Sequence, residues 1–151
     1  MGRERRRCSG LTMVELLVVV AIVGIAAGGS VLRLPRVVEA VRLETALHQL
    51  GADLGQARTL AVASARHVRL VLREGGTSYA RQSAAAGAFQ LDRTRRLPAG
   101  IRIALVGSGG TLTFSPLGDA ENATIVLESR AGTRRALVIN QRGRVRVLEP
   151  R

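Results

Sequence analysis

The chain has 151 residues and a formal net charge of +12, carried by 23 arginines and no lysine against 11 acidic residues. This length fits one domain preceded by an N-terminal segment. The positive charge favours an anionic partner or surface, although an arginine-only excess also follows from genomic base composition. Three aromatic residues, Tyr79, Phe89 and Phe114, are too few for the base-stacking platform of a single-strand-binding protein. The single cysteine, Cys8, excludes an intrachain disulfide, so the core must be sufficient alone.

An apolar run over residues 11–32 dominates the N-terminal part of the sequence. Glu15 is the only charged residue between Arg7 and Arg33. As a helix, this run would extend about 33 Å, which is enough to cross a hydrocarbon core of about 30 Å. The arginines ahead of the run predict, by the positive-inside rule, a cytoplasmic N-terminus and an exported remainder. We therefore expect a transmembrane helix over residues 11–33.

Glu15 is costly within this run. A carboxylate costs about 2.5–3.5 kcal/mol at the centre of a membrane helix, and less near its end, where Glu15 lies. An ordinary cleaved secretory signal is the alternative, and the small residues 26–30 would suit its cleavage site. The run is long for the core of such a signal, however, and an acidic residue near its start would weaken one. Glu15 instead suggests a partner charge that arrives later.

The sequence after the run has the pattern of an amphipathic helix over residues 34–65. Apolar residues recur at three- and four-residue steps, and polar residues, Asp53 among them, mostly fill the other face. Because few residues in this stretch break helices, we expect one continuous helix over about residues 11–65. Pro35 should kink this helix, because proline removes a backbone donor and clashes with the preceding turn.

From residue 66 onward the apolar period changes to two, which indicates short β-strands separated by glycine-rich turns. A helix followed only by strands predicts an α+β fold, with residues 66–151 as a β-rich domain. Residues 83–88 are small, and we expect them to form a flexible connection. The seven expected strands cover about residues 67–73, 77–82, 101–106, 111–114, 123–128, 135–140 and 144–148.

Signals of catalysis or metal binding are weak. His48 lies on the amphipathic helix and His67 begins a strand, and neither belongs to a ligand set at metal-binding spacing. The sequence contains no phosphate-binding loop, no Gly-x-Ser-x-Gly and no His-Glu-x-x-His. We therefore expect no catalytic residue, no metal site and no cofactor, and a soluble exported enzyme is the least supported class.

A short motif surrounds the start of the apolar run. Basic residues are followed by Gly10, and then by Leu-Thr-Met-Val-Glu ending at Glu15. This arrangement resembles the class III signal of type IV pilins and type II secretion pseudopilins. In that signal a glycine precedes the cleaved bond, a hydrophobic residue begins the mature chain, and a glutamate is its fifth residue. The sequence departs at Leu11, where most members have Phe, and at Met13, where Leu is usual, but both residues remain bulky and apolar.

This resemblance implies a specific maturation. A prepilin peptidase would remove residues 1–10 as a leader by cutting between Gly10 and Leu11, and would methylate the new amine of Leu11. The helix over residues 11–33 would anchor the chain in the inner membrane, with its C-terminal domain in the periplasm, until the subunit joins a filament. Glu15 would then pair with the Leu11 amine of a neighbour, because unpaired charges in an apolar bundle are costly. The implied partners are the peptidase, other major and minor pilins or pseudopilins, and an inner-membrane assembly platform.

Two segments in the C-terminal half carry a second motif. Residues 114–118 read Phe-Ser-Pro-Leu-Gly, and residues 138–146 read Val-Ile-Asn-Gln-Arg-Gly-Arg-Val-Arg. Together they look like the GspH/FimT group of minor pseudopilins and minor pilins. This resemblance implies a pilin-like fold, in which the long N-terminal helix packs on a small domain of two antiparallel β-sheets. The sequence has no acidic C-terminal loop like the calcium site of major pseudopilins, so we expect no calcium.

The end of the chain, residues 130–151, holds seven arginines and one acidic residue. In FimT-like minor pilins of naturally competent bacteria, a Gly-Arg-x-Arg motif near the C-terminus binds DNA, and arginine suits this role because its planar fork can engage phosphate in two places. The alternative is that Arg144 and Arg146 are the outward residues of an alternating edge strand, and a related Gly-Arg turn also occurs in secretion-system members. The candidate DNA-binding residues are Arg134, Arg135, Arg142, Arg144 and Arg146.

The two resemblances imply a minor pseudopilin of the GspH type, a structural subunit of the type II secretion pseudopilus that serves protein export across the outer membrane. The alternative is a FimT-like minor type IV pilin that binds DNA for uptake in natural transformation. Gene neighbourhood would separate them, because secretion genes would favour the first reading and pilus-assembly genes the second.

Overall fold

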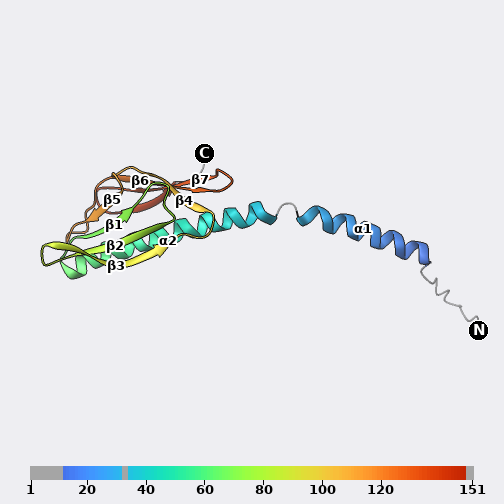
Figure 1. Cartoon of the computed structure of the whole chain (residues 1–151), viewed down its shortest axis with the longest axis horizontal. Helices are drawn as coiled ribbons and strands as arrows, with labels where there is room; N and C mark the ends of the chain where they lie inside the picture. Colours follow the sequence, from blue (N-terminus) through green and yellow to red (C-terminus); the bar gives the residue numbers. More distant parts are fainter. Residues whose placement is uncertain (1–11, 32–33, 149–151) are drawn as a thin grey trace, which may run out of the picture. The chain divides into compact units, whose positions relative to one another are not determined.

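The computed structural model describes residues 12–31 and 34–148, except for the side chains of residues 26–36. The chain divides into an N-terminal unit that ends at Pro35 and a compact unit that begins at Arg36 (Figure 1). The compact unit contains both β-sheets and most of the second helix, so it is the part of the chain with a hydrophobic core.

Two helices, α1 (Met13–Val31) and α2 (Leu34–Ser64), occupy the stretch for which the sequence predicts one helix. Pro35 is the second residue of α2 within its described bounds. Residues 32–33 lie outside the described residues, so one continuous helix with a kink at Pro35 stays a prediction. Within the described part of the chain, no helix combines the length and the apolar character that a membrane span needs.

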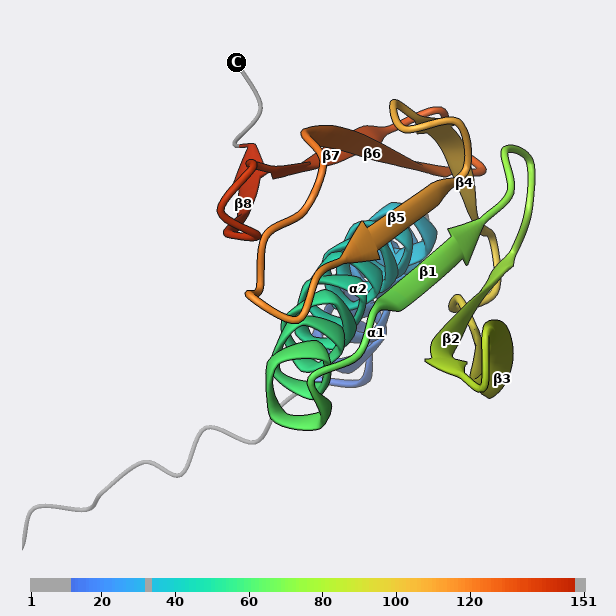
Figure 2. The ribbon, with the colours of Figure 1, turned by 90° about the vertical axis from the view of Figure 1, so that its left-hand side faces the viewer.

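The strands after α2 form two four-stranded antiparallel sheets, with the orders β3-β2-β1-β5 and β4-β6-β7-β8. Both sheets lie against α2, as the end-on view in Figure 2 shows. The expected α+β fold with two antiparallel sheets is therefore confirmed. The strands are β1 (Val68–Leu72), β2 (Ser78–Ala85), β3 (Ala88–Arg96), β4 (Ile101–Val106), β5 (Thr111–Phe114), β6 (Ala123–Ser129), β7 (Arg134–Ile139) and β8 (Val145–Leu148).

Strand β3 is the only one of the described strands that lies outside the strands predicted from the sequence. Residues 83–85 continue β2 instead of forming a flexible connection, so that prediction is wrong. A tight turn at Ala86 and Gly87, with φ of 50° and 83°, then leads into β3. Most of β3 is exposed, so its side chains show little alternation between apolar and polar. A bulge at Asp92, where the register with β2 shifts, interrupts the two-residue alternation of side chains along the strand.

The core forms where an apolar stripe on α2 meets the inner faces of both sheets. The stripe follows the predicted three- and four-residue steps, and none of its side chains is more than 2% exposed. Burial of each leucine contributes on the order of 1.5–3 kcal/mol. The stripe consists of Leu43, Ala46, Leu47, Leu50, Leu54, Ala57 and Ala61, and it joins Val68, Leu70 and Phe114 of the first sheet and Ile103, Ile125 and Leu137 of the second in one cluster.

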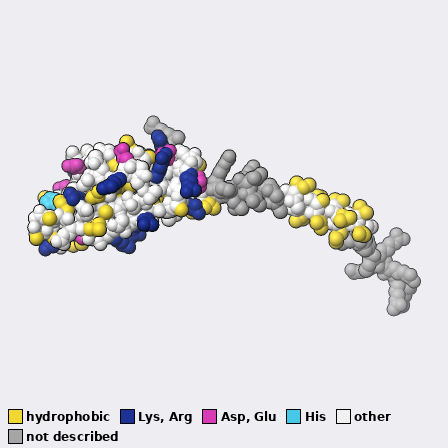
Figure 3. Space-filling model, viewed as in Figure 1, with side chains coloured by type: hydrophobic (Ala, Val, Ile, Leu, Met, Phe, Trp, Pro, Cys, Tyr) yellow, Lys and Arg dark blue, Asp and Glu magenta, His cyan; other side chains and the backbone are white. Residues whose placement is uncertain are grey.

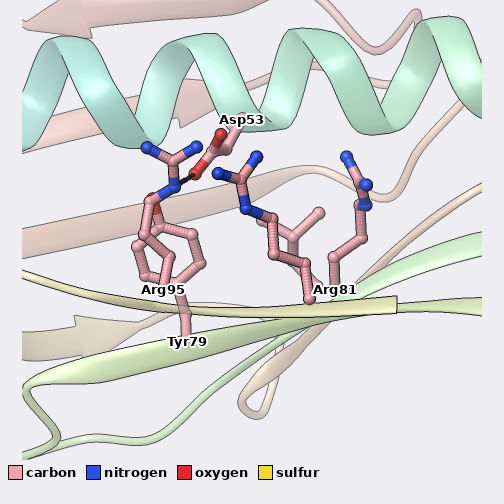
Figure 4. Close-up of a pocket in the computed structure, with 6 residues that line it drawn as sticks. Asp53, Tyr79, Arg81 and Arg95 are labelled. Carbon is pink, nitrogen blue, oxygen red and sulfur yellow. Dashed lines mark hydrogen bonds and ion pairs between the residues drawn. The ribbon is translucent and has the colours of Figure 1, made fainter. Parts of the chain in front are cut away.

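Asp53 is buried at the side of this stripe, so its predicted place on the polar face of the helix is wrong. The hydroxyl of Tyr79 donates to Asp53 Oδ2 at 2.5 Å, and Arg95 Nε lies 2.9 Å from the same oxygen (Figure 4). A buried carboxylate is costly unless it is paired and hydrogen-bonded, so both contacts offset the cost of burying Asp53. Burial and the hydrogen bond to Asp53 raise the pKa of Tyr79 well above its ordinary value of 10.0.

The raised pKa of Tyr79 makes the stability of the fold depend on pH under alkaline conditions. Above pH 10 the unfolded chain loses the phenol proton while the folded chain keeps it, so the free energy of unfolding should fall as pH rises. Tyr79 is the only tyrosine, so tyrosinate absorbance reports on this residue alone. The signal should appear near pH 10 in denaturant and, without denaturant, only as the protein unfolds.

The Tyr79→Phe variant is the control for this titration. It should lower the free energy of unfolding at neutral pH by about 1.5–3 kcal/mol, because the bond to a charged group is lost. It should also lack the decline in stability that Tyr79 causes above pH 10. Tyrosinate absorbance near pH 10 in a chain that circular dichroism shows to be folded would contradict the assignment.

Candidate functional site

The first candidate site is the start of α1, where Gly10, Leu11 and Glu15 are expected to act. Gly10 and Leu11 lie outside the described residues. Glu15 is in the first turn of α1, and its backbone N–H donates to Thr12 Oγ1 at 3.3 Å. The backbone N–H of Leu16 donates to the Thr12 carbonyl at 3.2 Å, so Thr12 is the N-terminal cap of the helix.

Thr12 and Glu15 have the spacing of a capping box, in which a Ser or Thr cap is followed three residues later by Glu or Gln. A carboxylate in the first turn is also stabilised by the positive end of the helix dipole, typically by about 0.3–1 kcal/mol. Glu15 therefore has a local role in its own helix besides the predicted assembly role. The Thr-x-x-Glu spacing is visible in the sequence and could have revealed this role.

The described side chains of α1 around Glu15 are apolar and exposed in the single chain. The large ones from Met13 to Ile25 are between 51% and 81% exposed. A helix that is apolar on all sides is normally buried. The described apolar surface of α1 therefore favours an apolar environment, and a carboxylate in such an environment needs a partner charge.

The second candidate site is the hairpin of β7 and β8, whose loop comprises residues 140–144. Asn140 closes the loop with three hydrogen bonds. Its N–H donates to the Arg144 carbonyl at 3.1 Å, its Oδ1 accepts from the Arg144 N–H at 2.9 Å, and its carbonyl accepts from the Gly143 N–H at 2.8 Å. Gly143 has a φ of 67°, in the left-handed region that favours glycine. The loop backbone is thus fixed, and it carries Arg142 and Arg144 as exposed side chains.

This loop packs against the segment between β5 and β6. A Cβ atom on Gly143 would collide with the carbonyl oxygen of Gly118. The same oxygen accepts a hydrogen bond from Arg58 Nε at 3.0 Å. Gly118 has a φ of 84°, and a Cβ atom there would lie 3.1 Å from Val62 of α2. The two segments of the GspH/FimT-like motif, far apart in the sequence, therefore meet against α2.

Arg142 and Arg144 line an open hollow of about 370 Å³ together with Asn122, Asn140 and Gln141. Guanidinium and amide N–H groups are suitable donors to phosphate oxygens. Among the described residues, no carboxylate forms an ion pair with either arginine. The hollow is therefore a positively charged surface.

The five candidate arginines do not form one cluster. Arg134 begins β7, at the end opposite the hairpin loop, and lies 3.7 Å from Glu128. Arg135 faces the other side of the sheet, because successive strand residues alternate, and lies 4.0 Å from Glu44 of α2. Arg146 is exposed on the edge strand β8. Figure 3 likewise shows arginine side chains in separate groups on the face in view.

The two histidines lie on the surface of the compact unit. His48 Nε2 is 3.3 Å from Glu44 Oε1, one helical turn away, and His67 is exposed before β1. In the part of the chain that the structure describes, no group of three or more His, Cys, Asp or Glu side chains could hold a metal ion.

Comparisons with known sequences give two matches. The family profile described as "Type II transport protein GspH" matches residues 46–143. The profile described as "Prokaryotic N-terminal methylation motif" matches residues 5–31, which include Gly10, Leu11 and Glu15. No curated protein matches the chain.

Solved structures of minor pilins and pseudopilins share the fold. The type IV minor pilin FimU of Pseudomonas aeruginosa is 24% identical, with a TM-score of 0.61 over 74% of this chain and 91% of FimU. The minor pseudopilin EpsH from the type II secretion system of Vibrio cholerae is 12% identical, with a TM-score of 0.64 over 76% of this chain and 97% of EpsH. These likenesses confirm the expected pilin-like fold. The GspH profile matches more than half of this chain, so the chain belongs to the family of type II transport protein GspH.

Proposed function

We propose that this chain is a minor pseudopilin, a non-catalytic subunit near the tip of the periplasmic pseudopilus that helps to export proteins across the outer membrane by type II secretion. The observation that supports this function is the presence, in one chain, of an N-terminal methylation motif over residues 5–31 and a GspH domain over residues 46–143. The pilin-like fold shared with the minor pseudopilin EpsH agrees with it.

The N-terminal motif supports maturation by a prepilin peptidase and assembly with other pilins or pseudopilins. The peptidase cuts between Gly10 and Leu11 on the cytoplasmic side and methylates the Leu11 amine. The chain then stays in the inner membrane until an assembly platform moves it into the filament. In this proposal residues 1–10 are the leader, 11–33 the membrane and filament-core helix, 34–65 the amphipathic helix and 66–151 the periplasmic domain.

Glu15 is the proposed assembly charge. In the filament its carboxylate pairs with the methylated Leu11 amine of a neighbouring subunit. Two unpaired charges in an apolar helix bundle are costly, and pairing offsets much of that cost. Pairing also specifies the register between subunits, because one charge on each helix permits one alignment.

Substitution of Gly10 by valine should block maturation, because the bulky side chain occupies the position before the cleaved bond. The full chain can be co-expressed with a prepilin peptidase and examined by mass spectrometry. The wild type should lose residues 1–10 and gain one methyl group, whereas Gly10→Val should keep its leader. Gly24→Val is the matched control, because nothing lies within 4 Å of a Cβ atom at Gly24, and it should be cut normally. Normal cutting of Gly10→Val, or an uncut wild type, would remove this proposal.

Replacement of Glu15 by glutamine separates the two roles of this residue. Glutamine can keep the capping box but not the charge, so Glu15→Gln should be cut normally and still fail to enter filaments. Cells with the native assembly genes can be tested by cross-linking the subunit to its neighbours. Thr12→Val is the opposite control, since it costs the helix about 1 kcal/mol of capping but keeps the charge and should still assemble. Incorporation of Glu15→Gln at the wild-type level would contradict the assembly role.

The hollow lined by Arg142 and Arg144 supports a second candidate function, that of a FimT-like minor type IV pilin that binds DNA for uptake. Both side chains are exposed, and amide groups beside them provide further donors for phosphate oxygens. Arg146 on β8 adds a third charge near the same end of the chain. The minor pilin FimU, which has the same fold, belongs to a type IV pilus.

Under this second function, the compact unit from residue 36 onward should bind duplex DNA with little sequence preference. Its affinity should fall steeply with salt, because each neutralised phosphate releases counterions. Replacement of Arg142 and Arg144 by glutamine should weaken binding equally for all sequences. It should also reduce the slope of log K against log salt by about 2, since each phosphate contact contributes about one. Fluorescence anisotropy over a series of salt concentrations measures both quantities.

The matched control replaces Arg134 and Arg135 by glutamine, which removes the same charge at the other end of β7 and should leave the slope unchanged. Circular dichroism melting would show that both double variants fold. If DNA does not bind even at low salt, or both pairs of substitutions weaken binding equally, the hollow is not a DNA site.

A further inference from the structure

A separate group of arginines lies on the first sheet, and neither proposed function uses it. Arg81 on β2 and Arg93 on β3 stand directly opposite each other in the antiparallel register, and Arg95 stands opposite Tyr79. Arg81 and Arg95 point from the sheet toward α2 (Figure 4). Arg93 lines the same pocket, so three guanidinium groups share one side of this hairpin.

This arrangement is electrostatically unfavourable without a further partner. Opposite side chains in an antiparallel pair have Cβ atoms about 4.5–5.5 Å apart, and like charges at such positions destabilise a sheet. The nearest buried acid, Asp53, is already engaged, because one of its oxygens contacts both Tyr79 and Arg95. Asp53 therefore leaves the opposed pair, Arg81 and Arg93, without full compensation.

Asp92 compensates this pair only weakly. Its Oδ1 accepts a hydrogen bond from Ser83 Oγ at 2.6 Å, while its Oδ2 is 3.7 Å from Arg81 Nε, too far for a hydrogen bond. Arg81 Nε is buried and has no hydrogen-bond partner among the described residues. Arg93 is exposed, and no described carboxylate forms an ion pair with it. Within the described residues, Arg81 Nε therefore has no hydrogen-bond partner, and the exposed guanidinium of Arg93, opposite it in the register, has no carboxylate partner.

The size of the pocket determines where a ligand could bind. Its free volume of about 10 Å³ has room for about one water molecule. A larger ligand would therefore bind at the mouth, where Arg93 is exposed, and not inside. Guanidinium forks match the oxygens of carboxylates and phosphates, which accept two parallel hydrogen bonds. We propose that Arg81 and Arg93 form a binding site for one oxyanion, a carboxylate or phosphate group, beside Asp53.

The test follows the Nε–Hε signals of arginine by NMR in the full ¹⁵N-labelled chain in a non-ionic detergent. Inorganic phosphate is titrated in one series and acetate in another, with sodium chloride keeping the ionic strength constant. The signals of Arg81 and Arg93 should shift and saturate at millimolar anion. The series that saturates at lower concentration identifies the oxyanion that the site prefers.

Two variants make this test specific. Arg93→Gln should abolish the saturable shift at Arg81, because one of the two forks is lost. Arg96→Gln removes the same charge from the same strand but on the opposite face of the sheet, and it should leave the shift intact. Arg93 is exposed, so its substitution should preserve the fold, which a circular dichroism melt would verify. No saturable shift with either anion, or equal effects of the two variants, would overturn the proposal.

Discussion

The buried stripe of α2 is the constraint on which the rest of the compact unit depends. Each sheet has four strands and one apolar face, and neither face can be covered by the sheet itself. The stripe places seven side chains between the two sheets, so one helix covers the inner faces of both. Residues at the sides of the stripe then determine where other groups lie. Asp53 anchors the β2–β3 hairpin through Tyr79 and Arg95, and Arg58 anchors the segment around Gly118.

The amphipathic helix is predictable from the sequence because its apolar residues repeat with the helical period and few breakers interrupt them. Strand β3 is not predictable in the same way. It is exposed over most of its length, and the bulge at Asp92 shifts the register partway along. Ala86, in the turn before it, has a positive φ. Alanine rarely adopts this conformation, so its presence does not predict a turn. The prediction for Asp53 is wrong because a polar residue at the margin of the stripe can either face solvent or bind a buried partner. The partners of Asp53 come from strands that are distant in the sequence, so the local pattern does not indicate them.

The candidate sites show the same limit. The arginines near the C-terminus are neighbours in the sequence, and the sequence therefore suggests one cluster. Alternation along β7 turns Arg134 and Arg135 to opposite faces, and each finds its own carboxylate. Only Arg142 and Arg144, in a loop, come together. The contact of Gly143 with Gly118 depends on residues 25 positions apart, so no local pattern could predict it. The hydrogen bond from the Glu15 N–H to Thr12 Oγ1, by contrast, is local, and the Thr-x-x-Glu spacing in the sequence predicts it.

The contact among Arg58, Gly118 and Gly143 also affects how this surface can evolve. These residues hold the hairpin loop in place, and a side chain at Gly118 or Gly143 would meet another part of the chain. Arg142 and Arg144 have exposed side chains that the fold does not require. Mutations at these two positions can change the charge of the surface while its shape stays constant. The charge of this surface and the contacts that hold its backbone are therefore carried by different residues, so one can change without the other.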